Sequence, residues 1–159
     1  MHEQFLREAI RLALEGLQQG AGGPFGAVVV QGETIVGRGF NRVLATNDPT
    51  AHAEVIAIRE ACALLGDHHL HGCTVYASCE PCPMCLAACY WAQADRIYYG
   101  ATATDAAAAG FADDFIRQDI VRPLPQRLLQ LTPLLHDEAL APFAAWQAKV
   151  DRQLYGPQV

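Results

Sequence analysis

Four side chains in this sequence have types and spacings that suit metal-assisted chemistry on a water molecule. His52 and Glu54 lie two positions apart, and Cys82 and Cys85 lie three positions apart. Zinc in a catalytic site takes nitrogen and sulfur ligands from three side chains and leaves its fourth position to water. His52, Cys82 and Cys85 are therefore predicted to hold Zn²⁺. Glu54 is poorly placed to bind the same ion as His52, and we expect it to carry protons for the water.

The cysteines leave two alternatives open. Cys79, Cys82 and Cys85 are equally spaced, so a redox pair of the Cys-x-x-Cys kind is one alternative. A closed structural zinc site with Cys79 as the fourth ligand is the other. Both alternatives leave Glu54 without a role, and we therefore favour the open site with three ligands. The remaining cysteines are expected to be small buried apolar residues, namely Cys62, Cys73 and Cys89.

A second group of histidines consists of His68, His69 and His71. These side chains could hold another metal ion. We favour a solvated loop over residues 66–72 instead, on the premise that no acidic or thiol partner lies nearby in the sequence.

The hydrophobic pattern places the four side chains at the starts of helices. The predicted elements are a helix over residues 5–17, a hairpin of strands 26–30 and 34–39, a helix over 51–65, a strand over 73–78, a helix over 81–91, a strand over 96–100 and a last helix over 142–154. His52 thus starts one helix, and Cys82 and Cys85 start the next. This order predicts a single α/β domain over residues 1–159, with helices covering both faces of a sheet.

Composition limits the classes of binding partner and the cellular compartment that we expect for this protein. The 159 residues include 11 Lys and Arg against 17 Asp and Glu, a net charge of -6 that disfavours non-specific nucleic-acid binding. No apolar run reaches the ~18 residues of a membrane span, and charges interrupt the first residues in a way that signal peptides do not allow. We expect a cytoplasmic protein with neither nucleic acid nor membrane as a partner. Its cysteines should serve metal binding or catalysis in preference to disulfides.

Taken together, His-x-Glu at 52–54 and Pro-Cys-x-x-Cys at 81–85 carry the signature of the zinc deaminases. The chain resembles the cytidine/deoxycytidylate deaminase superfamily, and within it the bacterial guanine deaminases. The second resemblance covers nearly the whole chain and is carried by residues 23–30, 47–54, 78–85, 90–92, 105–107, 110–111, 115–116, 142–146 and 154–155. It implies a cytidine-deaminase-like three-layer α/β/α fold with a mixed sheet of about five strands. It also implies Zn²⁺ as cofactor and the hydrolysis of guanine to xanthine and ammonia.

The same resemblance implies roles for further residues. Glu54 would pass a water proton to N3 of the base and later protonate the leaving amino group, and Asp113 would read the base edge and help to move protons. Asp114 is a rival for that role, because a local alignment can slip by one position there. The full set of residues implied to contact the purine base is Asn41, Phe25, Ala53, Trp91, Asp113 and Tyr155.

The C-terminal segment, about residues 138–159, is implied to form a lid over the active site. The resemblance also implies that this chain forms a homodimer, and in some family members this segment is exchanged between the two subunits. The chain departs from the family pattern in one respect, because residues 156–159 extend past Tyr155. Three other functions stay open: deamination of adenosine in tRNA, deamination of another amino-substituted ring such as cytosine or an aminotriazine, and a zinc-bearing interaction module without catalysis.

Overall fold

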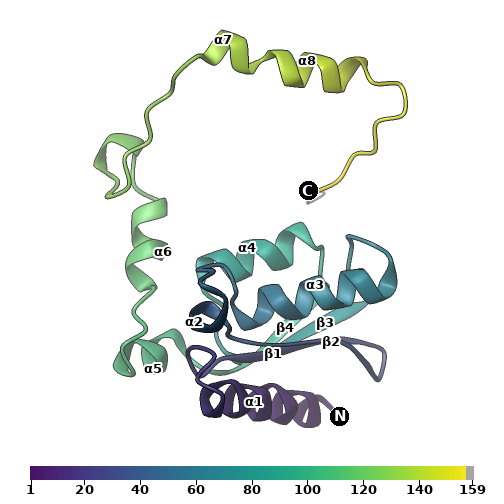
Figure 1. The fold of residues 1–159 in the computed structure, drawn as a ribbon, viewed down its shortest axis with the longest axis vertical. Coiled ribbons are helices and arrows are strands. Elements are labelled where there is room, and N and C mark those ends of the chain that lie inside the picture. The colour runs from purple at the N-terminus through teal and green to yellow at the C-terminus, as the bar shows by residue number, and fades with distance from the viewer. Residues whose placement is uncertain (157–159) are drawn as a thin grey trace.

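A four-stranded mixed sheet forms the centre of the computed structural model, which describes residues 1–156 (Figure 1). The strands are β1 (Gly26–Gln31), β2 (Thr34–Phe40), β3 (Cys73–Cys79) and β4 (Arg96–Ala101), in the spatial order β2-β1-β3-β4. β1 runs antiparallel to both β2 and β3, whereas β3 and β4 run parallel. The parallel pair requires a crossover, and the helix α4 (Pro83–Trp91) supplies it.

Helices cover both faces of the sheet. The helix α1 (His2–Gln18) packs on one face, and α3 (Ala53–Leu65) packs with α4 on the other (Figure 1). Successive residues of β1 serve opposite faces, as strand geometry dictates. Val28 and Val30 join the cluster that contains Phe5 of α1, and Val29 joins the cluster that contains Ala57 of α3. The expected three-layer α/β/α fold with a mixed sheet is confirmed, with four strands among residues 1–156.

Glycines on β2 allow α3 to lie close to the sheet. A Cβ atom on Gly39 would collide with the backbone oxygen of Ala53, and one on Gly37 would collide with that of Ala57. Only residues without a side chain tolerate such an approach of helix backbone to strand. The first turn of α3, which carries Glu54, is therefore held against β2.

The chain beyond β4 forms an arm that leaves the sheet. It contains α5 (Ala103–Ala108), α6 (Asp114–Ile120), the 3₁₀ turn η1 (Leu124–Gln126), α7 (His136–Ala139) and α8 (Ala141–Ala148). Figure 1 shows α7 and α8 standing well away from the three layers, with only the end of the chain returning toward α4. Before the arm, one further short helix, α2 (Val43–Thr46), lies between β2 and α3.

Two of the differences from the predicted element boundaries bear on the site and the arm. The predicted helix over 142–154 was too long, since α8 ends at Ala148 and residues 152–155 have no regular structure. The predicted helix over 81–91 begins two residues later, because Cys82 is the N-cap of α4 and Pro83 is its first residue. Within residues 1–156, no helix has the length and apolar character needed to cross a membrane.

Candidate active site

Two helix N-termini bring the predicted metal ligands together. His52 is the N-cap residue of α3, Cys82 is the N-cap residue of α4, and Cys85 lies in the first turn of α4. The Nδ1 atom of His52 lies 3.5 Å from the Sγ atom of Cys82 and 3.5 Å from that of Cys85. Tetrahedral zinc, with bonds of about 2.0 Å to nitrogen and 2.3 Å to sulfur, sets such atoms about 3.5 Å apart. The three side chains therefore fit a zinc ion without rearrangement.

Hydrogen bonds prepare one of the two thiols as a thiolate. Cys82 accepts hydrogen bonds from the Cys85 thiol and from the Cys85 backbone N–H, and together with nearby His52 these lower the pKa of Cys82 to about 4. Cys85 keeps its proton in this arrangement, and its hydrogen bond to Cys82 raises its pKa. The contact between the His52 ring and Cys82 raises the pKa of His52. Zinc binding would displace the remaining protons, because only thiolates and neutral imidazole act as ligands.

Glu54 lies beside the three ligands and is buried, with 8% of its surface exposed. Burial raises the pKa of its carboxyl group above the usual value, because a carboxylate loses hydration there. A raised pKa brings a carboxyl group closer to the range in which it can both take up and release protons at neutral pH. The burial of Glu54 beside the ligands and its raised pKa suit a residue that carries protons during a reaction.

A cavity of about 690 Å³ opens in front of the ligands. His52, Glu54 and Cys82 form part of its wall. Most of the remaining wall is apolar and includes Phe25, Phe111, Phe115 and Ile116. Phe25 and Phe111 meet edge to face, with ring centroids 5.0 Å apart. A mostly apolar cavity with few polar groups at one end is the usual form of a small-molecule site.

Asn41 is buried in the cavity wall and is held in one orientation. Its Oδ1 atom accepts hydrogen bonds from the backbone N–H groups of Gly23 (3.3 Å) and Val43 (3.1 Å). Nδ2 has no acceptor among the described residues. An asparagine amide can both accept and donate, and here the acceptor is bonded to the backbone while the donor is left for a ligand.

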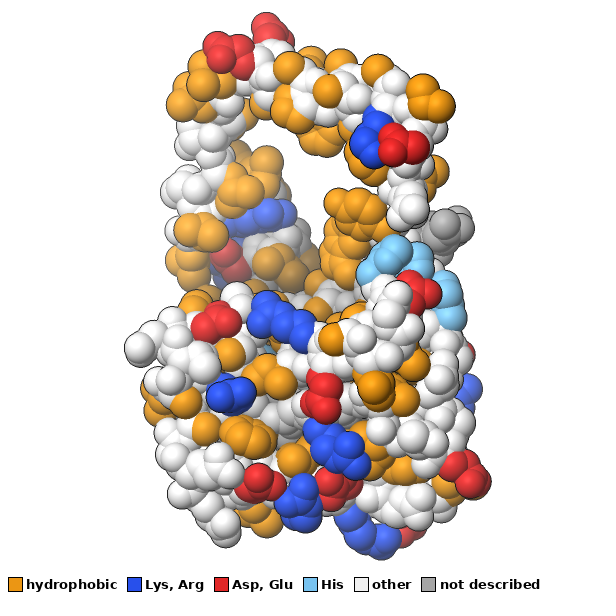
Figure 2. Space-filling model, turned by 45° about the vertical axis from the view of Figure 1, so that its right-hand side comes forward, with side chains coloured by type: hydrophobic (Ala, Val, Ile, Leu, Met, Phe, Trp, Pro, Cys, Tyr) orange, Lys and Arg blue, Asp and Glu red, His pale blue; other side chains and the backbone are white. Residues whose placement is uncertain are grey.

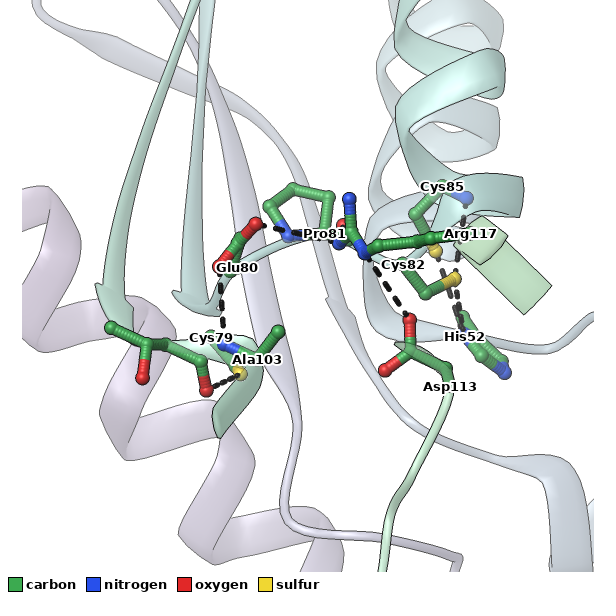
Figure 3. A network of polar contacts seen from close by, with 10 residues as sticks. His52, Cys79, Glu80, Pro81, Cys82, Cys85, Ala103, Asp113 and Arg117 are labelled. Atoms are coloured by element: carbon green, nitrogen blue, oxygen red, sulfur yellow. Dashed lines mark hydrogen bonds and ion pairs between the residues drawn. The ribbon is translucent and has the colours of Figure 1, made fainter. Parts of the chain in front are cut away.

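Asp113 and Arg117 form the outer polar part of the site (Figure 3). The Nε atom of Arg117 lies 4.0 Å from Oδ2 of Asp113, and neither atom has a hydrogen-bond partner within residues 1–156 although both are buried. Arg117 also donates to the backbone oxygen of Pro81 and pairs with Glu80 at 3.5 Å. The arm is thereby attached to the segment that presents Cys82. The cavity wall includes Asp113, whereas Asp114 is exposed and lies outside it.

Three residues that the resemblance implied lie outside the cavity wall of this chain. Ala53 is buried between His52 and Glu54. Trp91 is the last residue of α4, is 57% exposed, and approaches Gly156 at the end of the arm. Tyr155 is 68% exposed, and its ring centroid lies 6.2 Å from that of His68.

The structure separates Cys79 from the metal ligands. The metal-ligand group of this site consists of His52, Cys82 and Cys85 without Cys79, and the Sγ atom of Cys79 donates to the backbone oxygen of Thr102 at 3.5 Å. This excludes Cys79 as a fourth ligand and removes the closed structural site as an alternative. Cys73 and Cys89 are buried in the core as predicted, and Cys62 is partly buried against it.

Sequence reasoning missed several residues of this site. Phe111 and Phe115 flank Asp113, and their apolar type beside a candidate base-reading acid was a usable signal. Arg117 lies four residues after Asp113 on α6, the spacing at which helical side chains meet. The contact between Arg117 and Pro81 had no local signal, because it joins segments 36 residues apart.

The fold and the site define a class of protein. Residues 1–101 match the family model described as the cytidine and deoxycytidylate deaminase zinc-binding region. This chain belongs to that family of zinc-dependent deaminases. Its cofactor is zinc, consistent with the His52, Cys82 and Cys85 group.

Comparison with individual relatives narrows the likeness within the family. The chain is 49% identical to guanine deaminase of Bacillus subtilis over 97% of this chain and 99% of that protein. The crystal structure of that enzyme superposes with a TM-score of 0.94, covering 98% of this chain and 99% of that one. Guanine deaminase from Nitrosomonas europaea gives a TM-score of 0.66 at 29% identity, over 91% of this chain and 84% of that one. The tRNA-specific adenosine deaminase of Aquifex aeolicus is 38% identical over only 62% of this chain and 65% of that protein.

Proposed function

We propose that this protein catalyses the zinc-dependent hydrolysis of guanine to xanthine and ammonia. The observation that carries the proposal is one cavity that joins the His52, Cys82 and Cys85 group to the buried carboxyl of Glu54. The likeness to a guanine deaminase along nearly the full length of both chains supports the choice of base. The tRNA deaminase likeness covers only 62% of this chain, and the net charge of -6 offers little attraction for RNA.

Proton movement at the site falls to Glu54. Zinc, when bound, lowers the pKa of a coordinated water and so supplies a nucleophile at neutral pH. Glu54 takes a proton from the attacking water and delivers it to N3 of the base, while the water oxygen bonds to C2. Glu54 then transfers the second water proton to the amino nitrogen, the C2–N bond breaks, and ammonia leaves. One guanine and one water thus become one xanthine and one ammonia, and Glu54 ends in its starting state.

The polar groups of the cavity suit a purine with an acceptor-rich edge and an amino edge. The free Nδ2 group of Asn41 offers donors to ring nitrogen or carbonyl acceptors. The carboxylate of Asp113, which lines the cavity, offers an acceptor to the amino and imino edge. Phe25 gives the base an aromatic surface to pack on. Ala53, Trp91 and Tyr155 stay proposed contacts, and the last two require that the site be completed by another chain.

The activity is tested by ammonia release from guanine, adenine, cytosine, an aminotriazine and tRNA, each with zinc-loaded protein. We expect release from guanine to exceed release from every other substrate, with xanthine as the co-product. Release from tRNA alone would replace the proposal with adenosine editing. No release from any substrate would favour a zinc-bearing interaction module.

We infer that two copies of the chain exchange their arms. Nearly all of residues 121–156 are exposed in the single chain. They include large apolar side chains that a single chain leaves in contact with water, such as Val121, Leu128, Phe143 and Leu154. Exposed apolar area of this extent is typical of an interface, and exchange of identical elements is a simple way to cover it. Tyr155 lies outside the cavity of its own chain, so exchange is also the route by which residues from 138 onward would close a site.

Complementation between two inactive variants tests this exchange. One chain carries Glu54→Gln with an intact arm, and the other carries Tyr155→Ala with an intact Glu54. If arms are exchanged, the mixed dimer contains one site with both residues, and turnover should appear when the chains are co-expressed. A fully active monomer, or no recovery in a proven mixed dimer, would contradict the exchange.

Two further expectations belong to this proposal. We propose a single domain over residues 1–159, of which Pro157, Gln158 and Val159 lie outside the described residues. We place the enzyme in a cytoplasm, because a reducing compartment keeps the thiols of Cys82 and Cys85 available for zinc.

A further inference from the structure

The loop between α3 and β3 carries a second group of metal-ligand side chains, apart from the active site. Asp67, His68 and His69 are consecutive, and each offers one ligand atom within 4.8 Å of the other two. The Oδ1 atom of Asp67 lies 3.5 Å from Nδ1 of His68 and 3.3 Å from Nδ1 of His69. Figure 2 shows the histidine side chains gathered on one part of the surface beside an acidic side chain. None of these residues lines the active-site cavity.

These distances match the geometry of a late first-row metal ion. Two nitrogen or oxygen ligands on a tetrahedral ion, with bonds of about 2.0–2.2 Å, lie about 3.3–3.6 Å apart. Both measured nitrogen–oxygen separations fall in that range. Imidazole with carboxylate is a donor set suited to Zn²⁺, Ni²⁺ and Cu²⁺.

The backbone of the loop between α3 and β3 helps to hold the side chains of Asp67, His68 and His69 close to one another. Gly66 ends α3 in the left-handed conformation, with φ of 67°. Oδ1 of Asp67 accepts the backbone N–H of His69 at 2.9 Å, which fixes the carboxylate between the two imidazoles. The rings of His68 and His69 lie with centroids 3.9 Å apart. The sequence interpretation of a solvated loop considered the histidines and overlooked the adjoining Asp67.

We propose that Asp67, His68 and His69 form a second site for a divalent transition-metal ion. The ion would be Zn²⁺, Ni²⁺ or Cu²⁺, bound through two imidazole nitrogens and one carboxylate oxygen. Its remaining positions are open to water, because His68 and Asp67 are more than half exposed. The ring of His71 stacks on that of His69, with centroids 5.2 Å apart, but His71 is not part of the ligand set.

Metal binding to the zinc-loaded full chain, made without an affinity tag, tests the site. The protein is titrated calorimetrically with Ni²⁺ at neutral pH, and zinc and nickel are both counted after gel filtration. We expect one nickel per chain to bind in addition to one retained zinc. Asp67→Asn and His69→Ala should each weaken nickel binding by tenfold or more, since even the loss of an outer partner of a metal ligand costs about 10–100-fold.

Variants of the proposed ligands and of two other histidines distinguish nickel binding at this site from binding elsewhere on the surface. Asp67→Asn keeps a side-chain oxygen for the His69 N–H and removes only the charge, so the turn is preserved. His136→Ala is the matched control, because His136 pairs with Asp137 at 3.2 Å as a single exposed imidazole beside a carboxylate. Nickel binding should be unchanged in His136→Ala and in His71→Ala. Absence of a second equivalent, its survival in both Asp67→Asn and His69→Ala, or its loss in His71→Ala would overturn the assignment.

Discussion

Arg117 and Asp113 face each other across 4.0 Å on α6, each with a buried polar atom that makes no hydrogen bond in the described chain. The pair belongs to the arm and connects it to the metal ligands, because Arg117 also donates to Pro81 next to Cys82 (Figure 3). Arg117 therefore sets where the Asp113 carboxylate stands in the cavity wall.

Arg117 is expected to act through Asp113. Arg117→Gln should lower kcat/KM for guanine by about tenfold, because it removes the cation beside Asp113 and the hydrogen bond to Pro81, and tenfold is the scale of one hydrogen bond made by a charged group. Arg117→Lys should fall between wild type and Arg117→Gln, because it keeps the charge and loses the planar fork. In an Asp113→Ala background, Arg117→Gln should add little further loss, as two residues with one shared role are not additive. Fully additive losses would show that the two residues act separately.

Asp113 and Asp114 offer a matched pair of variants. Asp113→Ala should reduce kcat/KM for guanine by about 10- to 100-fold, because a charged acceptor for the base edge is lost. Asp114→Ala should have little effect, since Asp114 is exposed and outside the cavity wall. Zinc content, measured in parallel, should stay at the wild-type value in both. Equal losses in the two variants would show that Asp113 does not recognise the edge of the base.

Glu54→Gln should retain zinc and fold while losing turnover. General acid and base help is worth about 100- to 10,000-fold, and Glu54 takes part in more than one transfer. The neutral amide occupies nearly the same volume in a buried position, so the free energy of unfolding should change little. Steady-state kinetics with metal analysis and urea unfolding would check all three parts. Turnover near that of wild type would exclude Glu54 as the proton carrier.

How far the site could be predicted from the sequence depends on how far apart in the chain the contacting residues lie. His52, Cys82 and Cys85 follow from short motifs at helix starts, and the structure places them within zinc-binding distance. The orientation of Asn41 and the reach of Arg117 depend on segments far apart in the chain, which no local pattern encodes. The last helix was predicted too long because apolar residues continue past Ala148 at helical spacing, whereas their exposure suits contact with another chain.

Cys89 should make the protein less stable in alkali. The thiol is 3% exposed in the core, and burial raises its pKa from 9.0 to about 12. Between these values the unfolded thiol loses its proton and the folded one keeps it, so the free energy of unfolding falls as pH rises. The contribution is about 1.4 kcal/mol per pH unit. Urea unfolding of wild type and Cys89→Ala across this range should show a shallower fall in the variant, and parallel curves would contradict the assigned burial.

Removal and return of zinc tests the central claim most directly. The wild-type chain is stripped with a chelator, zinc is counted, and xanthine formation from guanine is followed as zinc is added back. We predict that turnover disappears with the metal and returns in proportion to zinc, reaching its maximum at one equivalent per chain. Cys82→Ala, which removes one ligand, should recover neither tight zinc binding nor turnover under the same treatment. Xanthine formation by zinc-free protein, or full zinc occupancy in Cys82→Ala, would contradict zinc-dependent guanine deamination at the His52, Cys82 and Cys85 site.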